Sequence, residues 1–232
     1  MGTQNNFVDY RTFYDTAGES DFILPSEVEE ATGLKYDDET LSRFLEALPQ
    51  KDDIEWCKKM DYIFIPGPPE VLSMERIVSI QPNLFHFDTK EVSETCLKRS
   101  LKTKWIIIKK SVLMHEIYHR ILSDLYEKIE KRENISHYCP GPAELAWAML
   151  IYRMSRKKYL LNGCEVLSDA TIGFDSPLTR SFPIMFMWNK PEDKIFLYRL
   201  EAMSIDIDAV TIVIPTRLST SINEDKEEDL PF

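Results

Sequence analysis

The segment HEIYH places His115 and His119 four residues apart, with Glu116 directly after the first histidine. On a helix, residues i and i+4 lie on one face, so both imidazoles can coordinate one metal ion. A glutamate beside such a pair can act as general base toward a metal-bound water. The spacing therefore predicts a zinc site for peptide hydrolysis, with Glu116 as its catalytic residue.

A catalytic zinc ion needs a third protein ligand and an open coordination position. Two residues further along the chain are candidates, His137 and Glu144. With Glu144 the site resembles the glutamate-type zinc metallopeptidases, and with His137 it resembles the three-histidine, DNA-associated SprT/Spartan type. The chain departs from both patterns at Tyr118 and Arg120, where those families have small or apolar residues. The choice of third ligand stays open.

Two stretches combine basic and aromatic residues and predict a surface for single-stranded nucleic acid. Cations that follow the phosphate backbone, with rings on which bases stack, are what single-strand binding requires. The first stretch, LKRSLKTKWIIIKK, contributes Lys98, Arg99, Lys102, Lys104, Trp105, Lys109 and Lys110. The second, YRMSRKKY, contributes Arg153, Arg156, Lys157 and Lys158. The alternative is a buried strand whose Trp105 packs inside, and a helix whose basic end favours the helix dipole.

The last ten residues, NEDKEEDLPF, hold five acidic side chains, one lysine and then Leu-Pro-Phe. Unpaired carboxylates are costly to bury, so we expect this segment to be a solvated tail. Leu230 and Phe232 can then enter an apolar pocket of another protein, while Pro231 limits the entropy lost on docking. The acidic run attracts a basic partner over a longer distance.

The sequence Asp229, Leu230, Pro231, Phe232 after consecutive acids closely resembles the C-terminal tip of bacterial single-stranded-DNA-binding proteins. The resemblance covers the last ten residues alone, because the helices predicted within 26–48 and over 111–132 argue against that family's OB-fold barrel. In that family, replication, recombination and repair proteins bind the tip. The resemblance therefore implies similar partners for an accessory protein of DNA metabolism, from a bacterium or its phage.

Composition narrows the class of protein. Of the 232 residues, 44% are hydrophobic and 11% aromatic, which is typical of a globular chain. No apolar run approaches the length of about 20 residues that a membrane span needs, and no secretory signal begins the chain. The four cysteines form no CxxC pair, so we expect reduced thiols in a cytoplasmic protein. The GxSxG, Walker and GxGxxG motifs are missing from the sequence.

The net charge of −11 argues against nucleic acid coating the whole surface, but the charge is unevenly distributed. Residues 97–158 carry 14 Lys and Arg against 6 Asp and Glu, so the rest of the chain is strongly acidic. Segregation of this kind can steer a charged partner toward one face.

Hydrophobic periodicity and chain-breaking residues indicate the elements that position these side chains. Helices are predicted in SEVEEATG, DDETLSRFLEALP, EVLSMERIVSIQP and AELAWAMLIYRMSRKK, and over residues 111–132. The first has a capping box from Ser26 to Glu29 and ends at Gly33. In the third, the residues expected to face inward are Val71, Met74, Ile77 and Val78.

Strands are predicted in DYIFIPGPP and KWIIIKK, and in four later runs, YLLNGCEVL, FPIMFMW, KIFLYRL and DAVTIVIP, with NKPEDK as a hairpin turn. This order predicts an α+β fold, helix-rich in its N-terminal and central part, with a C-terminal antiparallel β meander. We expect a loosely ordered segment over 1–25, one α+β domain over 26–217 and a flexible acidic tail over 218–232. The preferred function needs no cofactor, whereas the alternative, a metallopeptidase, requires zinc.

Overall fold

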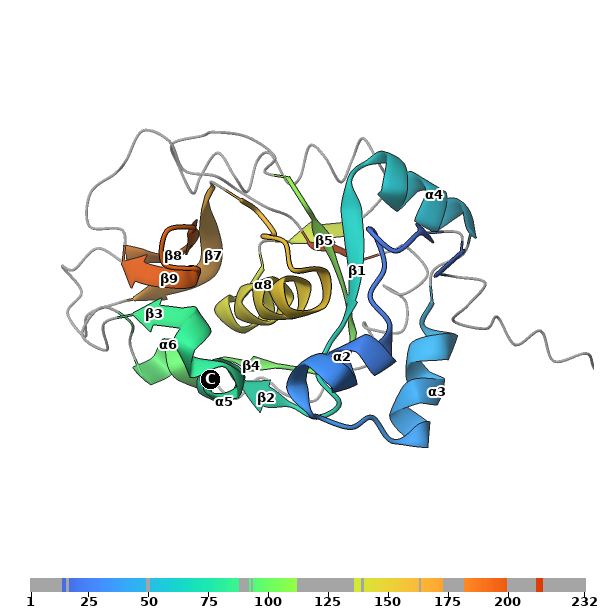
Figure 1. The fold of residues 1–232 in the computed structure, drawn as a ribbon, viewed down its shortest axis with the longest axis horizontal. Coiled ribbons are helices and arrows are strands. Elements are labelled where there is room, and N and C mark those ends of the chain that lie inside the picture. Colours follow the sequence, from blue (N-terminus) through green and yellow to red (C-terminus); the bar gives the residue numbers. More distant parts are fainter. Residues whose placement is uncertain are drawn as a thin grey trace, which may run out of the picture.

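The computed structural model describes residues 14–15, 17–48, 51–87, 92, 94–111, 136–138, 140–162, 164–172, 182–199 and 212–214. The HEIYH motif, the predicted helix beyond Ser111 and the acidic tail lie outside the described residues. The described elements, drawn in Figure 1, combine helices with antiparallel and parallel strand pairs, and this confirms the α+β class.

The described elements are short, with one exception. The helices are α2 (Pro25–Thr32), α3 (Asp38–Glu46), α4 (Lys51–Lys59), α5 (Met74–Ile80), the 3-10 helix η1 (Pro82–Leu84), α6 (Glu94–Lys98) and the longer α8 (Pro142–Arg156). The strands are β1 (Tyr62–Pro66), β2 (Leu72–Ser73), β3 (Phe85–Phe87), β4 (Ser100–Leu101), β5 (Trp105–Lys109), β6 (Ser136–Tyr138), β7 (Glu165–Ile172), β8 (Phe182–Asn189), β9 (Lys194–Arg199) and β10 (Ile212–Ile214).

A sheet with the strand order β1-β5-β10-β6 pairs two strongly apolar strands, β1 and β5. β1 and β5 are antiparallel, with Phe64 opposite Ile107, and every residue of β1 is buried. The outer edge of β1 is covered by the chain before α2, because Phe22 bridges to Phe64 and the Ile23 amide donates to the Phe64 carbonyl at 2.9 Å. The strands predicted in DYIFIPGPP and KWIIIKK are therefore confirmed.

A second sheet has the order β3-β9-β8-β7. β7, β8 and β9 are antiparallel neighbours in chain order, and β3 is parallel to β9. The turn between β8 and β9 falls in the predicted NKPEDK segment, where Asp193 takes a left-handed conformation (φ 52°). β10 does not join this sheet but lies between β5 and β6 in the first one.

α8 lies between the two sheets and contacts β1 and β5 on one side and β7 on the other (Figure 1). Its predicted apolar middle is confirmed, since every residue from Pro142 to Tyr152 is buried. Trp147 is fully buried and donates from Nε1 to the Pro66 carbonyl at 2.8 Å, so its polar group is satisfied inside the core. α8 is thus the rigid axis that sets the positions of the charged residues at its two ends.

The start of α2 differs from the prediction. The capping box expected from Ser26 is wrong, because α2 begins at Pro25 and the Leu24 amide donates to Glu27 at 2.8 Å. Proline suits the first helical position, where a backbone N–H has no partner within the helix. Gly33 ends α2 in the left-handed conformation (φ 75°), as the sequence predicts.

The helix predicted in EVLSMERIVSIQP begins four residues later than the pattern indicates, at Met74. Val71 is 62% exposed, so its predicted inward orientation is wrong. The residues after it form β2, which pairs with β4, and Ser73 then caps α5 by accepting from the Arg76 amide at 3.2 Å. Met74 is buried as expected.

We expect Gly67→Ala to lower the free energy of unfolding by about 3 kcal/mol, because the added methyl group has no room beside the neighbouring backbone. A Cβ at this position would lie 2.6 Å from the Lys104 carbonyl oxygen and 3.1 Å from that of Lys102. Both are backbone atoms, so the clash cannot be relieved by a side-chain rotation. Urea denaturation measures the loss.

Gly33→Ala is the matched control, because a Cβ there meets open space and the cost is limited to the left-handed backbone, about 1 kcal/mol. A Gly67→Ala protein as stable as the Gly33→Ala protein would contradict this packing of β1 against the 102–104 turn.

Candidate nucleic-acid interface

α8 separates the predicted basic residues into two groups. At its N-terminal end, Lys104 Nζ lies 2.6 Å from Glu144 Oε1. At its C-terminal end, Lys110 and Arg156 both bind the loop 18–22 that precedes α2. A helix of 15 residues is about 22 Å long, so the cations near one end of α8 are far from those at its other end. The two predicted stretches therefore do not form one continuous surface. The end of β5 and the end of α8 do meet.

Trp105 lies in the core rather than at the surface. Its side chain packs against the rings of Phe22 and Phe44, at centroid distances of 5.2 and 5.0 Å. Its Nε1 donates to the Phe44 carbonyl at 2.9 Å, and the residue is 7% exposed. A ring held in this way cannot stack on a base, so the structure corrects the binding role predicted for Trp105 to a structural one.

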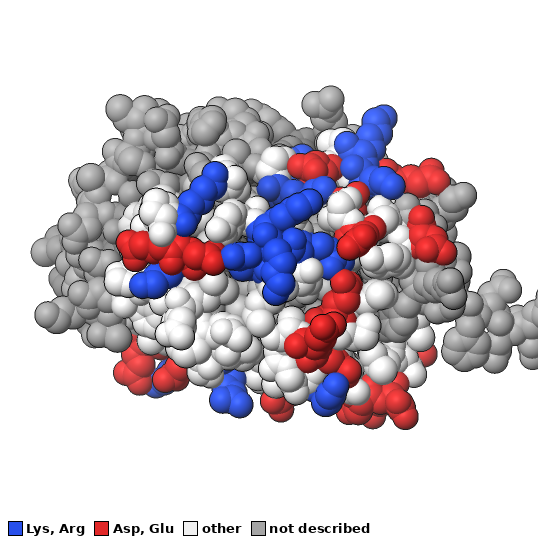
Figure 2. Space-filling model, in the orientation of Figure 1, with Lys and Arg blue, Asp and Glu red and all other residues white. Residues whose placement is uncertain are grey.

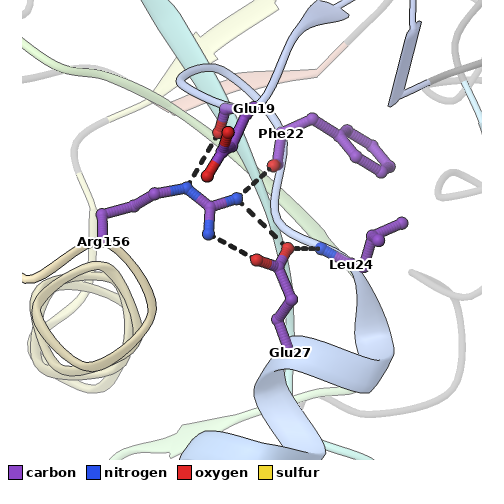
Figure 3. A network of polar contacts seen from close by, with 5 residues as sticks. All are labelled: Glu19, Phe22, Leu24, Glu27 and Arg156. Atoms are coloured by element: carbon purple, nitrogen blue, oxygen red, sulfur yellow. Dashed lines mark hydrogen bonds and ion pairs between the residues drawn. The ribbon is translucent and has the colours of Figure 1, made fainter.

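The Arg156 side chain is 7% exposed and binds four acceptor atoms (Figure 3). Nε donates to the Glu19 carbonyl at 2.8 Å and Nη2 donates to the Phe22 carbonyl at 2.7 Å. The two carboxylate oxygens of Glu27 accept hydrogen bonds from Nη1 and Nη2, so this contact is bidentate. Burial by itself lowers the pKa of the guanidinium, but the hydrogen bond with Glu27 and the charges nearby raise that pKa above its ordinary value. Arg156 thereby fastens α8 to α2 and to the loop.

Lys110 also binds this loop, through Asp21. Its Nζ lies 2.5 Å from Asp21 and 3.1 Å from Asp61, and the Asp21 side chain is 8% exposed. Burial lowers the pKa of Lys110, but the hydrogen bonds with the two aspartates outweigh burial and raise the pKa above its usual value. Burial raises the pKa of the Tyr152 hydroxyl, and the positive charges of Lys110 and Arg156 oppose that rise.

Arg153 joins α8 to the second sheet. Nε and Nη2 donate to the two carboxylate oxygens of Asp193 at 3.0 and 2.6 Å, and the guanidinium lies 5.0 Å from the Tyr159 ring centroid. Tyr159 in turn packs on Trp188 at 4.9 Å. The hydrogen bond from Arg153 holds the pKa of Asp193 below its ordinary value. This pair positions the β8–β9 turn on α8.

The lowered pKa of Asp193 predicts a pH-dependent contribution to stability. A carboxylate whose folded-state pKa lies below its unfolded value of about 3.9 stabilises the fold above that pH, and the contribution disappears as pH falls through the folded pKa. The Asp193 side chain is 46% exposed, so solvent screening limits the effect at neutral pH to about 1 kcal/mol or less. Urea midpoints of wild type and Asp193→Asn should therefore differ at pH 7 and converge as the pH falls below the ordinary carboxyl pKa and Asp193 becomes protonated in the folded state.

Glu70→Gln, an exposed substitution in the loop after β1, is the control and should change the urea midpoint at pH 7 less than Asp193→Asn does. A difference between wild type and Asp193→Asn that persists undiminished at the lowest pH would contradict this role of the pair.

Exposed lysines remain at the C-terminal end of α8. Lys157 and Lys158 directly follow the helix, are exposed and have no ion pair within the described ranges. Lys109 is half-buried and donates to the Met60 carbonyl at 3.0 Å. Figure 2 shows Lys and Arg side chains gathered in the middle of this face, with acidic side chains on both sides.

The cations at the other end of α8 are more dispersed. Arg99 and Lys102 are exposed, and Lys98 pairs with Glu94 across one helical turn, with both side chains largely in solvent. The structure therefore separates these residues, and Lys104, from the cluster around loop 18–22.

Of the candidate metal ligands, Glu144 is engaged in two structural contacts. One carboxylate oxygen accepts from the Gly141 amide at 2.8 Å and caps α8, and the other pairs with Lys104. Glu144 must release these contacts before it can bind a metal. His137 lies on β6 in the first sheet, and the HEIYH motif lies outside the described residues. Within the part of the chain that is described, no three His, Cys, Asp or Glu side chains are grouped to hold a metal ion.

Sequence reasoning missed the loop 18–22, at which the cations of β5 and α8 converge. No motif marks it, and its acceptors are mostly backbone carbonyls, which any sequence can supply. The one available signal is the run of acids around it, Glu19, Asp21 and Glu27, which are matched to the basic ends of two distant elements.

Comparisons with protein-family models, curated proteins and solved structures found no match to this chain. No helix among the described residues has the length and apolar composition needed to cross a bilayer.

Proposed function

We propose that this protein is an accessory factor of bacterial or phage DNA metabolism that docks replication, recombination or repair proteins through its C-terminal tip. The observation that carries the proposal is the sequence of residues 223–232, in which an acidic run precedes Leu230, Pro231 and Phe232. This order resembles the tip of bacterial single-stranded-DNA-binding proteins. No cofactor is required for such a role.

The chemistry of the tip supports this proposal. Phe232 and Leu230 carry apolar surface at the end of a strongly acidic segment, where the charges oppose burial in the protein's own core. An extended peptide of this kind fits an apolar pocket with a basic rim on another protein. Direct contact with single-stranded DNA through the lysines beside α8 is a second, separate part of the function.

Competition for a defined receptor tests the docking. The full chain is titrated into a purified bacterial repair protein that carries a fluorescent peptide with the tip sequence of a single-stranded-DNA-binding protein. We expect the full chain to displace the peptide completely, because both occupy one pocket. Binding of the chain without displacement, or no binding to several such receptors, would contradict the proposal.

A zinc metallopeptidase is the second candidate, and the HEIYH motif favours it. His115 and His119 would be ligands, Glu116 the general base, and His137 or Glu144 the third ligand. Zinc bound there would polarise a peptide carbonyl and activate water. Metal analysis of the purified protein is the test: one zinc per chain, lost on His115→Ala but kept in Glu116→Gln, supports this candidate, and a metal-free protein rejects it.

A further inference from the structure

Three elements far apart in the sequence deliver cations to the loop 18–22. Lys58, near the end of α4, has its Nζ 3.7 Å from the position that a Cβ would take at Gly18. Lys110, directly after β5, binds Asp21, and Arg156, at the end of α8, binds the carbonyls of Glu19 and Phe22. We propose that this junction, here called the loop-18 surface, is where the protein binds the backbone of single-stranded DNA.

The buried and the exposed cations of the loop-18 surface have different roles. Lys110 and Arg156 are paired with Asp21, Asp61 and Glu27, so they hold the loop in place and offset part of the acidic charge around it. Four exposed lysines lie on the elements that form this junction: Lys58 and Lys59 on α4, and Lys157 and Lys158 after α8. None of these four has an ion pair within the described ranges. Their ammonium groups are therefore available to phosphates.

Trp56 supplies an aromatic ring on α4, the helix that also carries Lys58 and Lys59. It is half-buried and stacks on Tyr62 at a centroid distance of 5.6 Å with an interplanar angle of 25°. Lys109 Nζ lies 5.3 Å from the centroid of the same tyrosine ring. A partly exposed indole beside lysines is suited to stacking with an unpaired base, which duplex DNA does not offer. Trp56 thus takes the role that the sequence pattern predicted for Trp105.

This inference deepens the nucleic-acid part of the proposed function and is independent of the tip. Fluorescence anisotropy with a labelled oligothymidine of 20 nucleotides measures the affinity over a series of salt concentrations. For single strands, each lysine–phosphate contact contributes about −0.7 to the slope of log K against log salt. Lys58→Ser with Lys158→Ser should therefore make the slope shallower by about 1.4.

Arg99→Ser with Lys102→Ser is the control, because it removes the same charge from exposed residues at the other end of α8. The control should keep the wild-type slope, whereas equal losses in the two double variants would mean a diffuse charge effect and overturn the assignment. Absence of salt-dependent binding by the wild type would overturn it as well.

Trp56→Leu should weaken binding about 5- to 150-fold, the range for one stacked base, with an unchanged salt slope. Urea denaturation of this variant checks that the fold is intact. An unchanged affinity would show that Trp56 does not contact the DNA. Deletion of 230–232 leaves the loop-18 surface intact and should leave the DNA affinity unchanged. Loss of receptor docking with normal DNA binding, or the reverse, therefore shows which of the two proposals fails.

Discussion

Arg156→Ala is expected to lower the free energy of unfolding by about 3 kcal/mol, measured by urea denaturation at pH 7. The side chain is 7% exposed and donates to two backbone carbonyls and both oxygens of Glu27. Removing it leaves a partly buried carboxylate without its counter-ion and two carbonyls without donors. The estimate is at the low end for a broken buried pair, because the Glu27 side chain is 26% exposed.

Two further variants isolate the cause. Lys158→Ala removes an exposed cation two residues away and should change stability by less than about 0.5 kcal/mol. Arg156→Met combined with Glu27→Met removes both charges and should be more stable than Arg156→Ala, because no unpaired carboxylate is left. If Arg156→Ala were as stable as Lys158→Ala, the network in Figure 3 would not hold loop 18–22 in place.

Phe232→Ala is expected to weaken binding to a tip receptor by about 10- to 100-fold, because burying a phenylalanine side chain contributes about 1.5–3 kcal/mol. The acidic run is unchanged in this variant, so the electrostatic attraction and its salt dependence should persist. Isothermal titration against the purified receptor, at two salt concentrations, measures both quantities.

Ile222→Ala is the matched control for Phe232→Ala, since it removes a large apolar side chain before the acidic run rather than after it. Its affinity should equal that of the wild type. Equal losses in the two variants would mean that the whole segment binds without a defined apolar anchor, contrary to the proposed docking.

The elements that the sequence predicts well are those whose position is determined mainly by one physical effect, such as the burial of apolar side chains. The apolar runs of β1, β5 and α8 are buried on every side, so their composition leaves little choice of position. The end of α2 at Gly33 is predicted equally well, because glycine adopts the left-handed backbone conformation more easily than other residues.

The candidate site is harder to predict, because contacts between distant segments determine it. Arg156 and its acceptor Glu27 are 129 residues apart, and Trp105 is 61 residues from the Phe44 carbonyl that it binds. A tryptophan among lysines gives the same sequence pattern whether its ring faces a base or the core. The Trp105 ring faces the core because it packs against Phe22 and Phe44, and no local sequence pattern encodes these two contacts.

We propose that the C-terminal tip is a docking element for another protein, and its exposure to solvent can be measured. Amide hydrogen exchange of residues 223–230, followed by mass spectrometry in the free chain and with saturating tip receptor, tests it most directly. We expect exchange at the intrinsic rate in the free chain and marked protection in the complex, with Phe232→Ala abolishing the protection. Strong protection in the free chain would mean that the tip packs on its own protein, and unchanged exchange in the complex would mean that the receptor does not bind it; either result contradicts the claim.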